Sequence, residues 1–476
     1  MNEINVLKKN SFYYTISSVA RLFTNSIIFI LIARSYGVNG FGSFATAHTL
    51  SSLFLLLADF GFDILITTEI ARNRTSVDSI IQKYFPVKVF FTAFAWVLLL
   101  FTIYIIPSTQ EAKSLIFIFS INMVFTTMLN MIYAVYKGIE EFQHEAKISL
   151  TMNLLLLVGI VFLSKYSVNL YWIAVLMVAI RLLGFLLGVI VISKHVAKKP
   201  FHFSFKQSFQ EFKVVLIFGL HLIFGTMFFQ IDSVLIFSLK GENEAGLYQA
   251  VFKVMVIVIM LSEIFIGVML PTITRLFNIG DENWVKYGKF LFKLLYVISL
   301  PASLFFYQYP EFIINVVYNK QEYLSSAGIM KIAGIIIFIR FFSEPFAMML
   351  TVANKQITRT KIVISASIFN ILLNILFIPM FGIIASIIIS AITNLFVGAL
   401  YIYFTKDTFK IWINDRKLFI PIFFIAVIKF LMDSLKLEAN FMIVFIILFL
   451  YSIVVGFFNF SKTERGLIFN LKKAIT

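Results

Sequence analysis

The sequence predicts an all-α integral membrane protein with about 14 transmembrane helices, arranged as two six-helix halves followed by two further helices. The composition, the apolar segments and an internal repeat are the three observations that predict this fold. Of the 476 residues, 60% are hydrophobic and 13% are charged, whereas soluble domains are roughly 45–50% apolar and about 25% charged. Such a chain cannot hide its apolar surface from water, so a lipid bilayer is its expected environment.

The apolar segments are long enough to cross a bilayer as helices, which requires about 20 mostly apolar residues each. The loops between them leave no room for a soluble catalytic domain, so we do not expect an enzyme. The predicted spans are residues 12–33, 43–66, 85–106, 114–136, 148–164, 169–192, 213–239, 246–270, 289–309, 328–352, 361–379, 382–404, 418–433 and 440–460.

The basic residues concentrate in alternate loops, as the positive-inside rule requires of cytoplasmic loops. This pattern predicts that both termini are cytoplasmic, and it accounts for the net charge of +16 without a nucleic-acid partner. The six basic residues in the predicted outer loops are Arg34, Lys113, Lys165, Lys240, Lys320 and Lys436.

The sequence gives little indication of a metal site or of a disulfide bond. The chain has no cysteine, which excludes a disulfide framework and Cys-type metal sites. Its five histidines are scattered and form no ligand cluster. We therefore expect neither a metal nor another cofactor.

One glycine-marked corner occurs twice in the chain. A shift of the stretch "ARSYGVNGFGSFATAHTL" by 204 positions places Gly37 on Gly241 and Gly42 on Gly246. The glycines tolerate positive φ, which a tight reversal between two helices requires. The same shift places Asp59 on Glu263, so two acids within apolar runs are also matched.

A weaker echo links "KISLT" from Lys147 to "KIVIS" from Lys361. Together the two matches predict parallel repeats related by a pseudo-two-fold axis along the membrane normal, a frequent design in transporters. The predicted domains are a lobe at 1–200, a second lobe at 201–405, and two appended helices with a cytoplasmic tail at 406–476.

Several charges lie inside the predicted spans. An ionisable residue at mid-membrane costs at least about 2.5–3.5 kcal/mol and usually faces the bundle interior or water. Arg21, Arg181 and Arg340 lie near mid-depth, and Lys253 lies somewhat nearer the outer side. Lys88 and Lys293 lie near inner span ends, where we expect their side chains to reach the interface.

The acidic residues in the spans suggest pairing, gating or coupling. Glu344 follows Arg340 by four residues, so we expect these two to neutralise each other. Asp59 and Glu263 are candidates for pairing with the basic inner loops or for a latch between lobes. Asp232, Glu263 and Glu344 are the candidates for proton or sodium coupling.

Two stretches of the first half carry a family resemblance. "IARSYGVNGFGSFATAHTL" and "ADFGFDILITTEIARNR" resemble bacterial polysaccharide repeat-unit flippases of the O-antigen type. These proteins belong to the multidrug/oligosaccharidyl-lipid/polysaccharide exporter superfamily. In the second half, "GLYQAVFKV" and "LPTITRLF" resemble the corresponding stretches. The resemblance implies two six-helix lobes around a central cavity in the bacterial cytoplasmic (inner) membrane.

The function implied by the resemblance is a flippase working by alternating access. It would move undecaprenyl-pyrophosphate-linked oligosaccharide repeat units to the outer leaflet for O-antigen and lipopolysaccharide synthesis, with polysaccharide polymerase and chain-length proteins as partners. The anionic pyrophosphate suits a cationic cavity of Arg21, Lys253, Arg181 and Arg340. Asn25, four residues after Arg21, would contribute hydrogen bonds to the sugar.

Three other functions are weighed against this one. A drug or small-solute antiporter of the same superfamily is disfavoured by the deep cations, because many drugs are cations. A membrane-embedded polymerase or glycosyltransferase would be expected to carry a large outer loop with catalytic residues, and the predicted outer loops are short. A channel fits a duplicated, rocking architecture less well.

Overall fold

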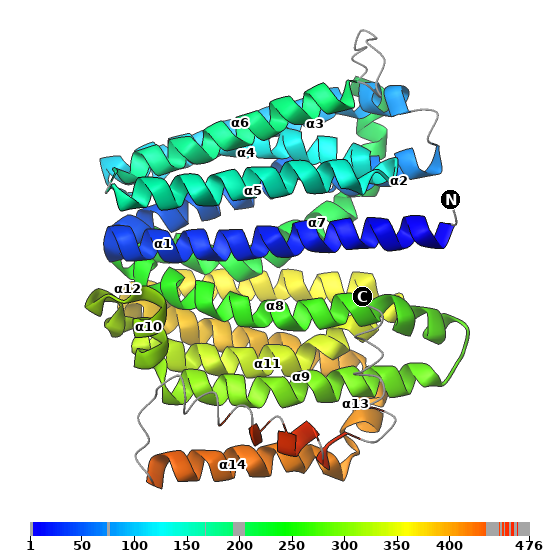
Figure 1. Cartoon of the computed structure of the whole chain (residues 1–476), viewed down its shortest axis with the longest axis vertical. Coiled ribbons are helices and arrows are strands. Elements are labelled where there is room, and N and C mark those ends of the chain that lie inside the picture. Colours follow the sequence, from blue (N-terminus) through cyan, green and yellow to red (C-terminus); the bar gives the residue numbers. More distant parts are fainter. Residues whose placement is uncertain are drawn as a thin grey trace. The chain divides into compact units, whose positions relative to one another are not determined.

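The protein is helical throughout the part of the chain that the computed structural model describes (Figure 1). That part comprises residues 3–73, 77–166, 168–193 and 205–434, together with 447, 450–451, 453–456, 458–460 and 464. No strand occurs among these residues, and nine of their helices have the length and hydropathy needed to cross a membrane. The predicted all-α membrane fold is confirmed.

The chain packs into two compact units, of which the first comprises Met1–Gln249 with Ile378–Gly382. Within it, α1 packs against α3, α4, α5 and α7, and α4 packs against α2 and α6. The helices α1 and α5 lie side by side (Figure 1). The elements are α1 (Glu3–Asp59), α2 (Phe62–Arg72), α3 (Val77–Ile105), α4 (Gln110–Gly138), α5 (Phe142–Lys165), α6 (Leu170–Ile192), α7 (Phe205–Lys240) and the start of α8 (Glu242–Asn278).

The second unit comprises Ala250–Phe377 with Ile383–Thr476. Its centre is the packing of α9 against α11. The short helix α13 docks on α9 through Trp412, whose buried ring lies over Gly288. Besides most of α8, the elements are α9 (Asn283–Gln308), α10 (Pro310–Tyr318), η2 (Gln321–Ser326), α11 (Ala327–Val352), α12 (Gln356–Phe404), α13 (Lys406–Ile413), η3 (Arg416–Leu418) and α14 (Phe419–Ser434).

The predicted spans coincide with these helices up to the thirteenth, except that the second span, 43–66, is interrupted at Phe60 and Gly61 between α1 and α2. Two long helices each contain two spans: α1 breaks at Gly37 and α12 breaks at Gly382. Both glycines combine a positive φ with an extended ψ, a region that is essentially restricted to glycine. The fourteenth span lies largely outside the described residues, so the number 14 stays a prediction. The short α10 and η2 lie in a stretch that we predicted to be a loop.

The two glycine corners pack into each other. Gly37 has a φ of 71° and its counterpart Gly241 has a φ of 88°. A Cβ atom on Gly42 would lie 2.0 Å from the carbonyl oxygen of Glu242, and a Cβ atom on Gly246 would lie 2.1 Å from that of Val38. Because Glu242 is the counterpart of Val38 in the repeat, the contact is reciprocal.

A hydrogen bond joins the corners at a second pair of matched positions. The Asn243 amide nitrogen donates to the Asn39 side-chain oxygen at 3.0 Å, and these residues are 204 positions apart. The two corners are therefore related by a local pseudo-two-fold axis, as the repeat predicts.

Each corner also forms a side-chain hydrogen bond to a backbone carbonyl at a second turn or helix break. The Tyr36 hydroxyl donates to the carbonyl oxygen of Val168, between α5 and α6. Its counterpart Lys240 donates through Nζ to the carbonyl oxygen of Pro379, beside the break in α12, at 2.8 Å. In both halves, the bond thus joins the repeated glycine corner to the turn that follows the fifth predicted helix of that half. The lobe boundaries at 200 and 405 stay predictions.

Candidate functional site

The four predicted deep cations divide between the two units. Arg21 and Arg181 belong to the first unit, on α1 and α6, and Lys253 and Arg340 belong to the second, on α8 and α11. Each unit therefore has its own set of charges. A joint site of Arg21 and Lys253 stays a prediction.

Arg21 lies over a buried carboxylate from another helix. Its Nη2 atom is 3.6 Å from Oε1 of Glu145 on α5, and the Nζ atom of Lys137 on α4 is 3.4 Å from the same oxygen. The Glu145 side chain is 1% exposed, whereas those of Arg21 and Lys137 are 37% and 30% exposed. Two half-exposed cations thus cover one buried acid.

Arg181 extends this group of charges. It interacts electrostatically with Arg21 and with Tyr133 of α4, and Tyr133 interacts in turn with Glu145. The Tyr133 side chain is buried, and its hydroxyl has no hydrogen-bond partner in the part of the chain that the structure describes. We call Arg21, Lys137 and Arg181, with Glu145 and Tyr133, the N-terminal cation cluster.

The cluster carries three positive charges and one negative charge. A guanidinium group can bind two phosphate oxygens in a bidentate manner, and an ammonium group adds a point charge. The half-exposed side chains of Arg21 and Lys137 are accessible to such an anion. Asn25 lies one turn along α1 from Arg21 and is partly buried, so it is on the helix face predicted for it.

The sequence did not point to Lys137 or Glu145. Both lie outside the predicted spans, in the stretch between α4 and α5 that was expected to be a loop at the membrane surface. Their helices continue past the apolar segments, and the extra turns bring the two side chains to Arg21. An acid in the first turn of a helix, beside a basic helix end, was the available signal.

A second charged network in the first unit surrounds Lys88 on α3. Its side chain is 0% exposed and is ion-paired with Asp59 and with Asp63, the latter at 3.4 Å. Asp59 also accepts hydrogen bonds from Thr127 and, at 3.1 Å, from Asn130. Two carboxylates thus hold Lys88 inside the protein, and its position relative to the membrane interface stays a prediction. A coupling role for Asp59 stays a prediction.

The second unit contains the predicted pair on α11. Arg340 Nη2 lies 2.7 Å from Glu344 Oε1, so this pairing is confirmed. Glu263 on α8 interacts electrostatically with both residues. In the first unit, buried Asp232 accepts a hydrogen bond from the Tyr248 hydroxyl at 2.9 Å. Roles of these acids in coupling or gating stay predictions.

Lys293 on α9 is the counterpart of Lys88, one position further along the repeat. It is buried, but its partners are Asp415 at 2.8 Å and Glu464 at 3.2 Å. Asp415 lies between two predicted spans, and the position of Lys293 relative to the membrane interface stays a prediction. Burial alone would raise the pKa of the Asp415 carboxyl, but hydrogen bonds from Lys293 and from the Lys417 amide outweigh it and hold the pKa at about 2.

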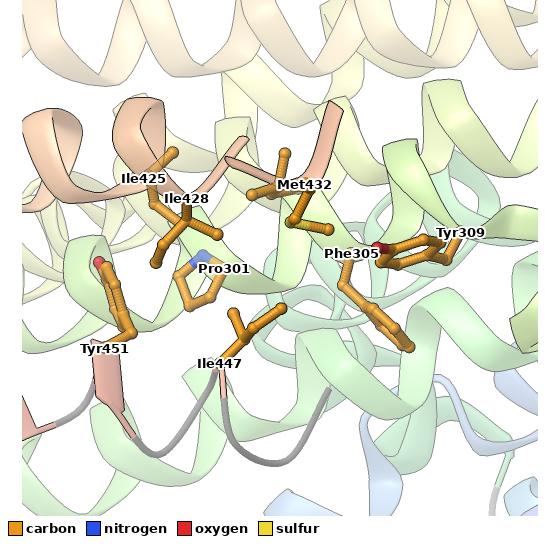
Figure 2. Close-up of a pocket in the computed structure, with 9 residues that line it drawn as sticks. Pro301, Phe305, Tyr309, Ile425, Ile428, Met432, Ile447 and Tyr451 are labelled. Atoms are coloured by element: carbon orange, nitrogen blue, oxygen red, sulfur yellow. The ribbon is translucent and has the colours of Figure 1, made fainter. Parts of the chain in front are cut away.

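A pocket lies between α9 and α14 in the second unit, and Figure 2 shows its lining. The side chains around it are almost wholly apolar, and the Tyr451 hydroxyl donates to the Val297 carbonyl at 3.1 Å. The pocket therefore suits a hydrocarbon group and not a charged one. Its lining residues are Pro301, Leu304, Phe305, Tyr309, Ile425, Ile428, Met432, Ile447 and Tyr451.

Two solved structures share this fold. The lipid II flippase MurJ in an inward closed conformation has a TM-score of 0.70 at 16% identity, covering 96% of this chain and 99% of that chain. A multidrug resistance MATE family transporter of the MOP superfamily, in its inward-facing conformation, has a TM-score of 0.63 at 11% identity, covering 84% of this chain and 98% of that chain. At these identities the likeness concerns the fold, which is that of MOP-superfamily transporters.

Sequence comparisons lead to a family. An uncharacterized membrane protein of Methanocaldococcus jannaschii is 30% identical over 193 residues, which are 40% of this chain and 36% of that protein. The match thus spans little more than a third of that relative. The family model described as "Polysaccharide biosynthesis protein" matches residues 7–277. Because this match covers more than half of the chain, the protein belongs to the polysaccharide biosynthesis protein family.

Proposed function

We propose that this protein is a flippase for undecaprenyl-pyrophosphate-linked oligosaccharide repeat units. The observation that carries the proposal is the N-terminal cation cluster, which places accessible Arg21 and Lys137 side chains inside a membrane-spanning unit. Retaining a charge such as Arg21 within an apolar span is costly, and an anionic cargo gives it a use. The family and the fold of lipid and drug transporters support the same reading.

The cargo would contact the cluster through its pyrophosphate. Arg21 and Arg181 would bind phosphate oxygens, and Lys253 and Arg340 of the second unit are proposed as further contacts during transport. A headgroup with about two negative charges that leaves a negative cytoplasm gains roughly 4–5 kcal/mol per 100 mV of membrane potential. We propose O-antigen repeat units of lipopolysaccharide as the cargo, with polysaccharide polymerase and chain-length proteins as partners, and no catalytic step.

Replacing Arg21 with Ala tests the proposal directly. Hydrogen bonds to charged groups contribute about 1.5–3 kcal/mol each, so flipping is expected to slow by about tenfold to a hundredfold. Arg21→Lys should restore part of the rate, because the charge remains but the bidentate fork is lost. The measurement is the flipping rate of a polyprenyl-pyrophosphate saccharide in proteoliposomes.

Arg72→Ala is the matched control, since this exposed arginine forms a surface pair with Glu69. Its flipping rate should equal that of the unmodified protein. The proposal fails if Arg21→Ala flips the lipid at the same rate as Arg72→Ala. Export of a cationic drug by proteoliposomes that do not flip the lipid would favour the antiporter, which the likeness to a MATE transporter keeps as the second candidate.

We propose an orientation in the bacterial inner membrane with both termini cytoplasmic. The chain has no cysteine, so single cysteines report topology without background. Ile279→Cys, in the exposed turn after α8, should resist an impermeant thiol reagent on intact cells, whereas Gln321→Cys, in exposed η2, should react. The reverse pattern would invert the orientation, and both sites should react after the membrane is opened.

A further inference from the structure

The Glu145 carboxylate is bound differently from the partly buried Asp59 carboxylate of the same unit. The Lys137 and Arg21 nitrogen atoms lie 3.4 and 3.6 Å from its Oε1 atom, beyond the usual length of a hydrogen bond. Asp59, by contrast, accepts hydrogen bonds from Lys88, Thr127 and Asn130. Buried polar groups normally have close hydrogen bonds, so the two long contacts of Glu145 distinguish it from Asp59.

The exposure of the partners is unequal. Glu145 is enclosed, whereas more than a quarter of each cationic side chain above it is exposed. An anion that approaches from the exposed side meets Arg21 and Lys137 first. The two flexible side chains can turn towards it, but the short, buried glutamate cannot follow them. The anion therefore competes with Glu145 for the same donors.

We infer that Glu145 is a built-in counter-ion, which a diphosphate headgroup replaces when it binds the N-terminal cation cluster. The inference rests on the proposed function and names the chemistry that the cluster selects. Among the cluster's own members, three cations and one carboxylate leave a surplus of two positive charges, which a diphosphate diester with about two negative charges balances. Glu145 keeps the empty site compact and weakens the binding, so that the headgroup can leave again.

Equilibrium binding to the purified full-length protein tests the inference, with inorganic pyrophosphate as the probe at constant pH and salt. Glu145→Gln removes the competing charge and should tighten binding by about tenfold, because like charges in contact are strongly unfavourable. Glu145→Asp keeps the charge and should bind less tightly than Glu145→Gln. Glu69→Gln, which breaks a surface pair with Arg72, is the control and should leave the affinity unchanged.

Unchanged or weaker pyrophosphate binding by folded Glu145→Gln overturns the counter-ion. If that variant does not fold, Glu145→Gln combined with Lys137→Gln keeps the net charge of the cluster. This double variant should bind at least as tightly as the unmodified protein despite the lost lysine, and weaker binding would count against the inference.

The lipid origin of the headgroup is tested with farnesyl diphosphate as a competitor. It should displace pyrophosphate at a lower concentration than unlabelled pyrophosphate does, and a weaker effect would exclude a lipid-borne diphosphate. These assays require no transport. A normal flipping rate in Arg21→Ala therefore contradicts the proposed function, whereas an unaltered pyrophosphate affinity in Glu145→Gln contradicts the counter-ion alone.

Discussion

Replacing Lys88 with Met is expected to lower the free energy of unfolding by about 3–5 kcal/mol, the usual cost of removing one partner of a buried ion pair. The lysine side chain is fully buried and is ion-paired with both Asp59 and Asp63. Without it, two partly buried carboxylates lose their cation, and Asp59 keeps only its hydrogen bonds from Thr127 and Asn130. The measurement is the melting temperature of the purified protein in detergent, with the yield of monodisperse protein beside it.

Lys429→Met is the matched control for Lys88→Met. Lys429 forms an ion pair with Asp433 at 2.7 Å, but its side chain is 44% exposed, and exposed helix pairs contribute only about 0.3–0.5 kcal/mol. Adding Asp59→Asn to Lys88→Met should recover part of the lost stability, because one unpaired charge disappears. Equal melting temperatures for Lys88→Met and Lys429→Met would show that the buried network does not stabilise the fold.

Replacing Gly42 with Ala is expected to destabilise the protein by about 1–3 kcal/mol, the range for overpacking a close contact. The new methyl group would lie 2.0 Å from the Glu242 carbonyl oxygen. The two corners must separate to admit it, which also strains the bond between Asn39 and Asn243. The same thermal melting experiment measures the effect.

Because the contact is reciprocal, the single and double variants at Gly42 and Gly246 should be related in stability. Gly246→Ala should cost about as much as Gly42→Ala, and the double variant should cost less than the sum, because residues in contact are not additive. Gly267→Ala is the control, since a Cβ atom there meets nothing within 4 Å. Additive losses, or a loss in Gly267→Ala as large as in Gly42→Ala, would contradict this account of the corner.

The helices could be predicted from the sequence because membrane spanning depends on local length and hydropathy. The corners could also be predicted, because a backbone break at Gly37 or Gly241 requires glycine and the repeat marks the positions twice. The short helix α10 could not be predicted, because its nine residues are too few to show a helical period clearly.

The charged partners could not be predicted in the same way. The pairing of Arg340 with Glu344 is local, four residues apart on one helix, and was recognised. Arg21 meets Glu145 through the packing of α1 against α5, which no spacing in the sequence reveals. Lys88 and Lys293 carry a usable signal, because two lysines only one position apart in the register of the repeat indicate a shared structural role.

The reciprocal corner contact has the form of an isologous dimer interface, in which the same patch is used by both partners. Here both partners belong to one polypeptide. In a homodimer any substitution enters both sides at once, whereas a fused pair can change one side alone. The chain uses this freedom: Val38 has Glu242 as its counterpart, and Glu242 accepts a hydrogen bond from the Thr109 hydroxyl. At Gly42 and Gly246 the freedom ends, since each copy makes room for the backbone of the other. Fusion therefore lets the two halves acquire different charges and different buried partners. The close contact at Gly42 and Gly246 still requires glycine in both halves.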